Sequence, residues 1–140
     1  MPAALSERLG FLLAKSHAIA HAIAEDTLAP LDLHVKEYAG LNVLYEAGPV
    51  SQQTVGEILG VDRTTMVAVV DELERKGLVQ RARNPDDRRA YALAITEEGL
   101  SLMRRARRLL AGAERGLVAP LSPAEVTQLK TLLARLIQTG

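Results

Sequence analysis

The fold is decided by residues 50–81, VSQQTVGEILGVDRTTMVAVVDELERKGLVQR. Ser51 is a residue type that caps helix N-termini, and the apolar spacing after it predicts a short helix that stops at Gly60. Asp62 is placed to cap a second helix directly afterwards. The stretch therefore predicts two helices joined by a turn of about three residues that contains glycine.

Both helices have an inward apolar face. On the first helix this face is formed by Val55, Ile58 and Leu59. On the second helix apolar residues recur at helical spacing, and they are Met66, Val69, Val70 and Leu73. Gly56 is small enough for the two helices to cross closely. This is the pattern of a helix-turn-helix, in which N-terminal residues of the second helix can reach base edges in a DNA major groove.

A β-hairpin is predicted directly behind the second helix. Gly77 ends that helix, and Leu78–Ala82 and Arg89–Ile95 have the composition and alternation of short strands. Asn84–Asp87, with proline at its second position, lies between them as the turn. A helix-turn-helix followed by a hairpin is a winged helix, and the hairpin is its wing.

Long helices are predicted on both sides of this region. Apolar spacing and high alanine content predict one helix from Ala3 to Leu28. Thr96 can cap a helix over Glu97–Leu117, whose inward stripe is Leu102, Met103, Ala106, Leu109 and Leu110. Ser122–Glu125 is a capping box with proline at the first helical position, and it predicts a last helix that runs to Gln138.

The last helix carries more apolar side chains than a small winged helix can cover, namely Val126, Leu129, Leu132, Leu133, Leu136 and Ile137. An exposed apolar stripe of that length is an association site. We expect a mainly α protein with a small β-hairpin, built as one domain over residues 1–140. Residues 1–30 and 97–140 are expected to supply a helical dimerisation layer, and residues 36–96 a winged helix-turn-helix region that binds DNA.

The composition excludes several kinds of protein. The chain has 140 residues, of which 48% are hydrophobic, so it can bury a core. It has no cysteine, which excludes disulfides, thiolate-bound zinc and cysteine nucleophiles. No apolar run reaches the length of a membrane span, and the first residues lack the pattern of a secretory signal. We therefore expect a cytoplasmic protein with no membrane partner.

The formal net charge of zero hides a strong segregation of charge. Residues 1–74 carry 4 Lys and Arg against 11 Asp and Glu, whereas residues 75–108 carry 10 against 4. A basic cluster of this kind is the usual mark of a polyanionic partner, although a solvated charged surface has the same composition. The basic cluster includes the predicted wing.

These parts, in this order, closely resemble the MarR family of bacterial winged-helix transcription regulators, from about Leu5 to Ile137. The resemblance is carried by residues 50–81 and by NPDDRRAYALAITEEG, residues 84–99. The second stretch has the family's wing pattern, in which an aspartate, any residue and an arginine precede a strand that ends in Thr-x-x-Gly. The matching residues are Asp87, Arg89, Thr96 and Gly99.

The resemblance implies a homodimer that binds an inverted-repeat operator in double-stranded DNA. On the second helix, Arg63 can bond guanine, while threonines can reach phosphates or a thymine methyl. In the wing, Arg89 is expected to enter a minor groove, with Asp87 orienting its guanidinium group. The candidate DNA-binding residues are Ser51, Gln52, Gln53, Arg63, Thr64, Thr65, Ala68, Arg81, Arg83, Asp87, Arg88 and Arg89.

Many members of this family are released from DNA by small, often aromatic or phenolic, anions that bind between the dimer layer and the winged domain. The candidate ligand-binding residues are Phe11, His17, His21, His34, Tyr38 and Tyr45, although each also fits a role as a core or interface residue. His17 and His21 are four residues apart, a spacing that two zinc ligands can share. His34, Glu25 or a residue from another subunit would have to complete a metal site.

The function expected from the sequence is a homodimeric DNA-binding transcriptional regulator, a repressor that a small aromatic or phenolic effector releases from a palindromic operator. No cofactor is expected. Two alternatives remain, a winged-helix module that binds another protein and a metal-responsive regulator that uses His17 and His21. An enzyme is not expected, because the chain has no cysteine and no catalytic constellation beyond those two histidines.

Overall fold

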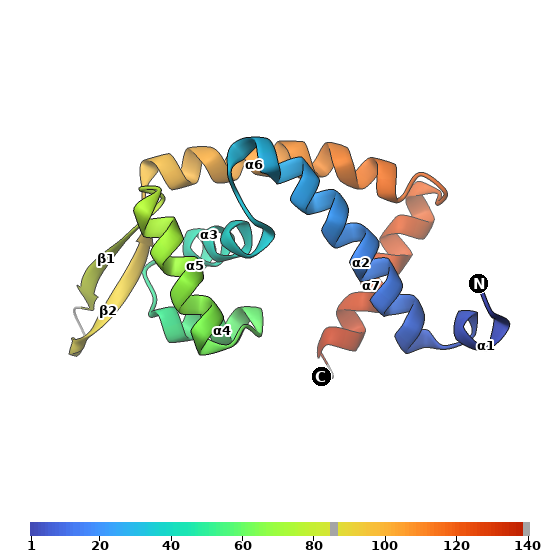
Figure 1. The fold of residues 1–140 in the computed structure, drawn as a ribbon, viewed down its shortest axis with the longest axis horizontal. Coiled ribbons are helices and arrows are strands. Elements are labelled where there is room, and N and C mark those ends of the chain that lie inside the picture. Colours follow the sequence, from blue (N-terminus) through green and yellow to red (C-terminus); the bar gives the residue numbers. More distant parts are fainter. Residues whose placement is uncertain (85–86, 139–140) are drawn as a thin grey trace. The chain divides into compact units, whose positions relative to one another are not determined.

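The computed structural model describes residues 1–84 and 87–138, and for residues 84 and 87–90 it describes the backbone alone. The expected mainly α fold with a small β-hairpin is confirmed (Figure 1). In chain order the elements are α1 (Ala3–Ser6), α2 (Leu9–Leu28), a 3-10 turn (Ala29–Leu31), α3 (Val35–Ala47), α4 (Gln52–Leu59), α5 (Arg63–Arg75), β1 (Val79–Asn84), β2 (Asp87–Ile95), α6 (Glu97–Leu117) and α7 (Pro123–Gln138). No helix in the described part of the chain is long and apolar enough to span a membrane.

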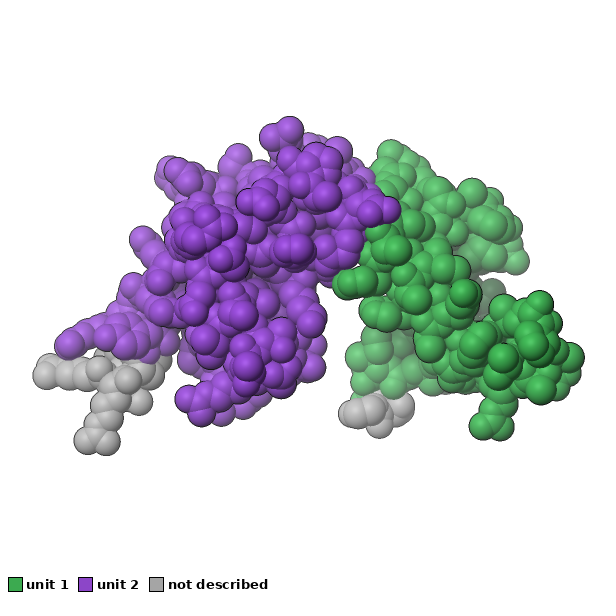
Figure 2. Space-filling model, in the orientation of Figure 1, with its two compact units in different colours: residues 1–23, 111–140 green, residues 24–110 purple. Residues whose placement is uncertain are grey.

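The chain forms two compact units (Figure 2). The first unit consists of Met1–Ile23 and Ala111–Gly140, and the second unit is Ala24–Leu110. The second unit holds α3, α4, α5 and the hairpin of β1 and β2, which we call the wing hairpin. Every buried residue among those described belongs to this second unit. The hydrophobic core of the described chain is therefore the core of the second unit.

That core draws on every long element of the second unit. Its most completely buried side chains are Val55, Val70, Leu28, Leu41, Leu73, Leu93 and Met103. Complete burial of one such leucine contributes about 2 kcal/mol. Because α4, α5 and β2 each place a side chain in the same core, burial holds the helix-turn-helix and the wing hairpin together.

Helices α6 and α7 begin where the sequence predicts. Ser122 Oγ accepts a hydrogen bond from Glu125 N at 3.1 Å, and Glu125 Oε1 accepts one from Ser122 N at 2.9 Å, which completes the predicted capping box. Thr96 Oγ1 accepts a hydrogen bond from Gly99 N at 3.0 Å and donates one to Gly77 O at 2.7 Å. Thr96 therefore caps α6 and also ties its start to the end of the α5 region.

The prediction of one helix from Ala3 to Leu28 is wrong at its start, because the helix is interrupted between α1 and α2. Ser6 Oγ donates a hydrogen bond to Ala3 O at 3.0 Å. Arg8 N bonds Leu5 O at 3.1 Å, the tighter pattern that often ends a helix. These short-range bonds close α1 before the hydrogen-bond ladder of α2 begins.

Two side chains predicted to face inward are exposed. Leu109 is 43% exposed and Ile58 is 59% exposed. The inward stripe of α6 runs through Met103, Ala106 and Leu110. Leu109 is therefore turned by about 100° from this stripe, since each helical residue rotates by that angle. Ile58 lies off the buried face of α4 in the same way.

The wing hairpin is longer than predicted. β1 pairs with β2 in antiparallel register, and Asn84 lies opposite Asp87 in the ladder rather than in the turn. Pro85 and Asp86, the central positions of the predicted turn, lie outside the described residues. β1 therefore ends at Asn84 and β2 begins at Asp87, with two residues between them in the sequence.

Candidate nucleic-acid interface

Helices α4 and α5 form the predicted helix-turn-helix. Ser51 Oγ accepts a hydrogen bond from Thr54 N at 3.1 Å, and Asp62 Oδ2 accepts one from Thr65 N at 3.1 Å, so both predicted N-caps are confirmed. Between the helices, Gly60 has a φ of 67°, a left-handed conformation that glycine adopts without strain. The turn that joins the two helices is thus set by local hydrogen bonds and one glycine.

The cap of α5 also has an electrostatic consequence. Thr65 Oγ1 donates a second hydrogen bond to Asp62 Oδ1 at 2.6 Å. These bonds from Thr65 hold the pKa of the Asp62 carboxyl below its ordinary value. The carboxylate is charged at neutral pH and lies at the N-terminus of α5, where negative charge stabilises a helix.

Helices α4 and α5 approach each other closely at Gly56. A Cβ atom at this position would lie 2.9 Å from Met66 Cγ and 3.2 Å from Val61 O. A larger residue would push the two helices apart. The prediction that Gly56 permits a close crossing is confirmed.

The wing hairpin is joined to the start of α4 by a short β-bridge. Val50 N donates to Leu93 O at 3.2 Å, and Leu93 N donates to Val50 O at 2.7 Å. The Leu93 side chain is also buried in the core. The hairpin is therefore anchored by both backbone hydrogen bonds and burial, and it stands beside the helix-turn-helix.

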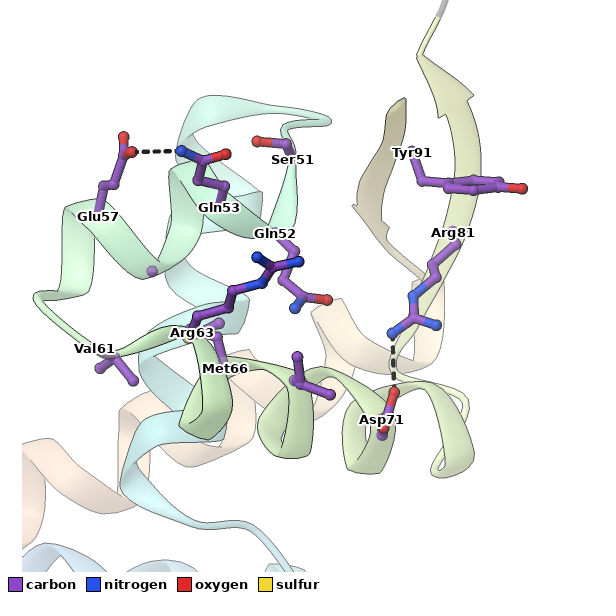
Figure 3. Close-up of a pocket in the computed structure, with 12 residues that line it drawn as sticks. Ser51, Gln52, Gln53, Glu57, Val61, Arg63, Met66, Asp71, Arg81 and Tyr91 are labelled. Atoms are coloured by element: carbon purple, nitrogen blue, oxygen red, sulfur yellow. Dashed lines mark hydrogen bonds and ion pairs between the residues drawn. The ribbon is translucent and has the colours of Figure 1, made fainter. Parts of the chain in front are cut away.

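A groove of about 1150 Å³ lies among α4, α5 and the wing hairpin, entirely within the second unit (Figure 3). Five of the predicted DNA-binding residues line it, namely Ser51, Gln52, Gln53, Arg63 and Arg81. The other lining residues are Gly56, Glu57, Val61, Met66, Val67, Asp71 and Tyr91. The tertiary structure thus gathers residues from three parts of the sequence on one concave surface.

One face of α5 points into this groove. Arg63, Val67 and Asp71 follow one another at intervals of four residues, which places them on one side of a helix, and all three line the groove. Arg63 and Gln52 both point into it (Figure 3). Three other candidates on α5 lie outside the groove lining: Thr64 and Ala68 are exposed, and the capping residue Thr65 is half-buried.

Sequence reasoning missed several residues of this surface. Val67 is 41% exposed and Tyr91 is 59% exposed, and neither was a candidate DNA-binding residue. The spacing of four from Arg63 was a signal for Val67 and Asp71. Tyr91 had no such signal, because nothing in an alternating strand shows which face will lie beside α5.

The basic residues of the wing hairpin have different surroundings. Arg81 Nη2 donates a hydrogen bond to Asp71 Oδ1 at 2.9 Å, and Arg83 is exposed. The side chains of three candidates, Asp87, Arg88 and Arg89, lie outside the described residues. Their expected roles in the minor groove stay predictions.

The candidate ligand-binding residues are divided between the units. Phe11, His17 and His21 belong to the first unit, whereas His34, Tyr38 and Tyr45 belong to the second. Tyr38 is half-buried, and Tyr45 is 44% exposed.

The histidines are also candidates for a metal site. The rings of His17 and His21 have centroids 5.6 Å apart. His34 Nδ1 lies 3.2 Å from Glu25 Oε2, and Glu25 Oε1 accepts a hydrogen bond from Val35 N at 3.0 Å. His34 and Glu25 thus contact each other at the start of α3. Within the described ranges, no three His, Cys, Asp or Glu side chains come together as a metal site.

Comparison with known proteins identifies the family. The model of the MarR family matches residues 33–91, which include the helix-turn-helix and most of the wing hairpin. A MarR-family transcriptional regulator from Rhodococcus sp. RHA1, known from its crystal structure, is 32% identical in sequence. It superposes with a TM-score of 0.89 over 96% of both chains. The chain belongs to the MarR family. As a MarR-family protein it is a transcriptional regulator and not an enzyme.

Other MarR-family structures show what relatives bind. CouR from Rhodococcus jostii RHA1, crystallised with p-coumaroyl-CoA, is 33% identical, with a TM-score of 0.83 over 96% of this chain and 95% of CouR. A mutant MarR from E. coli, crystallised with operator DNA, is 25% identical, with a TM-score of 0.83 over 91% of this chain and 92% of MarR.

A curated relative is similar over part of its length. A putative transcriptional regulatory protein for the hcr operon of Thauera aromatica is 36% identical over 99 residues, which are 71% of this chain. The aligned part spans 60% of that relative.

Proposed function

We propose that the protein is a homodimeric repressor that leaves an inverted-repeat operator when it binds a small aromatic acid or its thioester. The observation that carries the DNA-binding part is the groove of the second unit, where Arg63 and Val67 on α5 lie beside the N-terminus of α4 and the wing hairpin. Its mixture of hydrogen-bonding and apolar side chains, which includes Arg63, Gln52 and Val67, suits base edges and the backbone of a DNA duplex.

The groove residues have distinct tasks in this proposal. Arg63, at the first position of α5, bonds the O6 and N7 atoms of a guanine. Val67, one turn later, contacts a thymine methyl group. Ser51, Gln52 and the first backbone amides of α4 hold phosphate oxygens, because helix N-termini attract anions. Arg89 of the wing enters the neighbouring minor groove.

The homodimer is supported by the exposed apolar side chains of the first unit. None of its described residues is buried, although its helices carry many leucines. The exposed side chains are Leu5, Leu9, Leu12, Leu13, Ile19, Leu121, Leu129, Leu132, Leu136 and Ile137. Helices with this much uncovered apolar surface need a partner, and a second copy offers the same surface.

One relative supports the effector class, and another supports DNA binding. CouR binds p-coumaroyl-CoA, and at 33% identity it aligns with nearly the whole chain. The E. coli MarR complex shows that a relative with this fold binds operator DNA. In our proposal Tyr38 and His34 of the second unit are the first candidates to contact the ring and hydroxyl of the effector.

The DNA-binding part is tested with the purified full-length protein. A random-sequence duplex pool is passed over the protein to enrich a preferred site, and the affinity for that site is measured at several salt concentrations. We expect an inverted repeat, and an affinity that falls with salt by about 0.9 log units per log unit of salt for each phosphate contacted. No enriched duplex, or an affinity that salt does not change, would contradict DNA binding and favour a protein partner.

The enriched duplex also tests the assignments on α5. Arg63→Met is expected to relax the preference for one guanine, and Val67→Ser the preference for one thymine, each by about 1–3 kcal/mol of discrimination. Both variants are passed through the same selection as the wild type. An unchanged base preference in either variant would contradict the role of that residue.

The effector part is tested by competition. The complex with the enriched duplex is titrated with p-coumaroyl-CoA, with p-coumarate and with CoA alone. We expect the thioester or the free acid to release the DNA, and CoA alone to leave it bound. If none of a panel of aromatic acids and their thioesters lowers the affinity for DNA, the effector class is wrong while DNA binding stands.

A further inference from the structure

The groove contains an ion-pair cluster that joins the wing hairpin to the recognition helix α5. Arg81 on β1 donates from Nη2 to Asp71 Oδ1 at 2.9 Å, and its Nη1 lies 3.7 Å from Glu74 Oε1. Figure 3 shows the Arg81 side chain turned toward Asp71. We call these three residues the Arg81 cluster.

The Asp71 carboxylate lies at a position that is unfavourable for DNA binding. It lies on the same face of α5 as Arg63 and Val67, and it lines the groove. Its side chain is 59% exposed and that of Glu74 is 43% exposed. Two uncompensated carboxylates at this position would repel the phosphates of a bound duplex, since like charges brought together at an interface weaken binding.

Arg81 is the basic residue that pairs with these two carboxylates. Both of its terminal nitrogens are directed at carboxylates of α5, and its side chain is 35% exposed. A phosphate bound by the same N–H groups would compete with Asp71 for Arg81 and would leave the Asp71 carboxylate less well neutralised beside the DNA. The geometry is that of a guanidinium group already bonded within the protein.

The strand that carries Arg81 is itself held firmly. In the hairpin register Arg81 pairs with Leu93, the buried residue that also bonds to Val50. The ion pair with Asp71 adds a direct link from β1 to α5. The Arg81 cluster therefore connects two elements that must face DNA together.

We propose that Arg81 serves DNA binding indirectly, by neutralising the carboxylates of Asp71 and Glu74 on α5, rather than as a phosphate contact. This inference rests on the proposed DNA interface. The sequence predicts that Arg81 contacts DNA directly, because it lies in the basic cluster. The proposed role of Arg81 is instead to neutralise carboxylates of the protein.

The test is a double-mutant cycle with Arg81→Met, Asp71→Asn and the double variant. The probe is the duplex that the wild-type protein enriches from the random pool. Arg81→Met is expected to weaken binding by about tenfold, because two carboxylates then face the DNA. The double variant has the same formal charge as the wild type, and we expect its affinity to return to within about threefold of wild type.

The salt dependence separates the two roles of Arg81. If Arg81 neutralises carboxylates, the double variant keeps the salt slope of the wild type. If Arg81 contacts a phosphate, Asp71→Asn will not restore binding, and the slope will fall by about 0.9 in both variants that lack the arginine. That second result would overturn the proposal.

Two controls complete the experiment. Arg75→Met removes the same charge from the end of α5, where Arg75 pairs with Glu72 at 2.8 Å outside the groove lining, and we expect a loss below about threefold. Thermal unfolding checks that each variant folds. The ion pair is absent from the double variant, so recovery of DNA binding without recovery of the melting temperature would separate charge neutralisation from general stability.

The experiment also distinguishes the inference from the proposed function. If the wild type enriches a duplex and the double variant stays as weak as Arg81→Met, the inference alone fails. If the wild type enriches no duplex at all, the proposed DNA interface fails and the inference falls with it.

Discussion

At the scale of single residues, Thr96 and Gly99 show why the Thr-x-x-Gly pattern stands behind the wing. Thr96 bonds both Gly77 O and Gly99 N. A Cβ atom on Gly99 would overlap Leu78 O and lie 2.9 Å from Ile95 Cγ1. The pattern therefore meets a packing requirement at the point where the start of α6 crosses the first residues after α5.

Gly99→Ala is expected to destabilise the protein. The added methyl group overlaps the Leu78 carbonyl, so the start of α6 must move, at a cost of about 3 kcal/mol. Urea unfolding of the wild type and the variant measures this cost. Gly40→Ala is the matched control, since a Cβ there meets just Leu73 Cδ1 at 3.7 Å, an ordinary contact within the second unit. Equal stability of Gly99→Ala and the wild type would contradict the overlap.

Asp62 predicts a pH dependence at the start of α5. Its pKa is lowered from 3.8 by the hydrogen bonds from Thr65, so its contribution to stability is fully present above that pH. The contribution is lost as the pH falls through the lower pKa of the folded state. We expect Asp62→Ala to be less stable than the wild type at neutral pH, and the difference to shrink below pH 3.8.

Unfolding curves at a series of pH values measure this difference. Asp26→Ala removes an exposed carboxyl within α2 and serves as the control. A difference between wild type and Asp62→Ala that stays constant down to the most acidic pH would show that the charge of Asp62 does not stabilise the cap.

At the scale of elements, the end of α5 is attached to the start of α3 by an ion pair away from the groove. Lys76 Nζ lies 3.1 and 3.0 Å from the two carboxylate oxygens of Glu37 and donates to Asp32 O at 2.6 Å. Glu37 Oε1 also accepts a hydrogen bond from His34 N at 2.8 Å. The side chains of Lys76 and Glu37 are 12% and 3% exposed. This ion pair attaches the C-terminal end of α5 to the start of α3.

Lys76→Met is expected to destabilise the second unit by about 3 kcal/mol, because it leaves the buried Glu37 carboxylate without its cation. The double variant with Glu37→Gln should recover most of this loss, since glutamine is neutral and still accepts the bond from His34. Urea unfolding of both variants is the measurement. If the double variant is as unstable as Lys76→Met, the cost does not come from an unpaired charge.

At the scale of the whole molecule, the two units differ in how they bury apolar surface. The second unit has a complete core, whereas the described part of the first unit has no buried residue. Along α7, Leu129, Leu132 and Leu136 are each more than 40% exposed. The first unit can therefore be stable if these side chains are covered by a second chain, which is the basis of the proposed homodimer.

Leu132→Glu is expected to convert the proposed dimer to monomers, because it places a charge within the apolar stripe of α7. Sedimentation velocity measures the change in mass, and DNA affinity should fall with it since a single subunit meets half of an inverted repeat. Ala134→Glu adds the same charge at an exposed position off the stripe and should leave the dimer intact. A Leu132→Glu protein that remains a dimer would place the interface elsewhere.

Features that depend on residues close together in the chain can be predicted from the amino-acid sequence. Ser51, Asp62, Thr96 and Ser122 cap their helices within about four residues, so their roles could be predicted from local hydrogen bonding. Apolar periodicity located the helix-turn-helix and the wing hairpin in the same way. The break after Ser6 escaped prediction because a side-chain bond there competes with the helix ladder.

Which side chains share a surface, by contrast, depends on how the elements pack. Lys76 and Glu37 are 39 residues apart, and Arg81 meets Asp71 across two different elements. Such contacts depend on how α5 is rotated against the core and on the register of the hairpin, which no local pattern contains. For that reason the sequence shows Arg81 as one more member of a basic cluster, whereas in the folded protein Arg81 is hydrogen-bonded to Asp71 on α5.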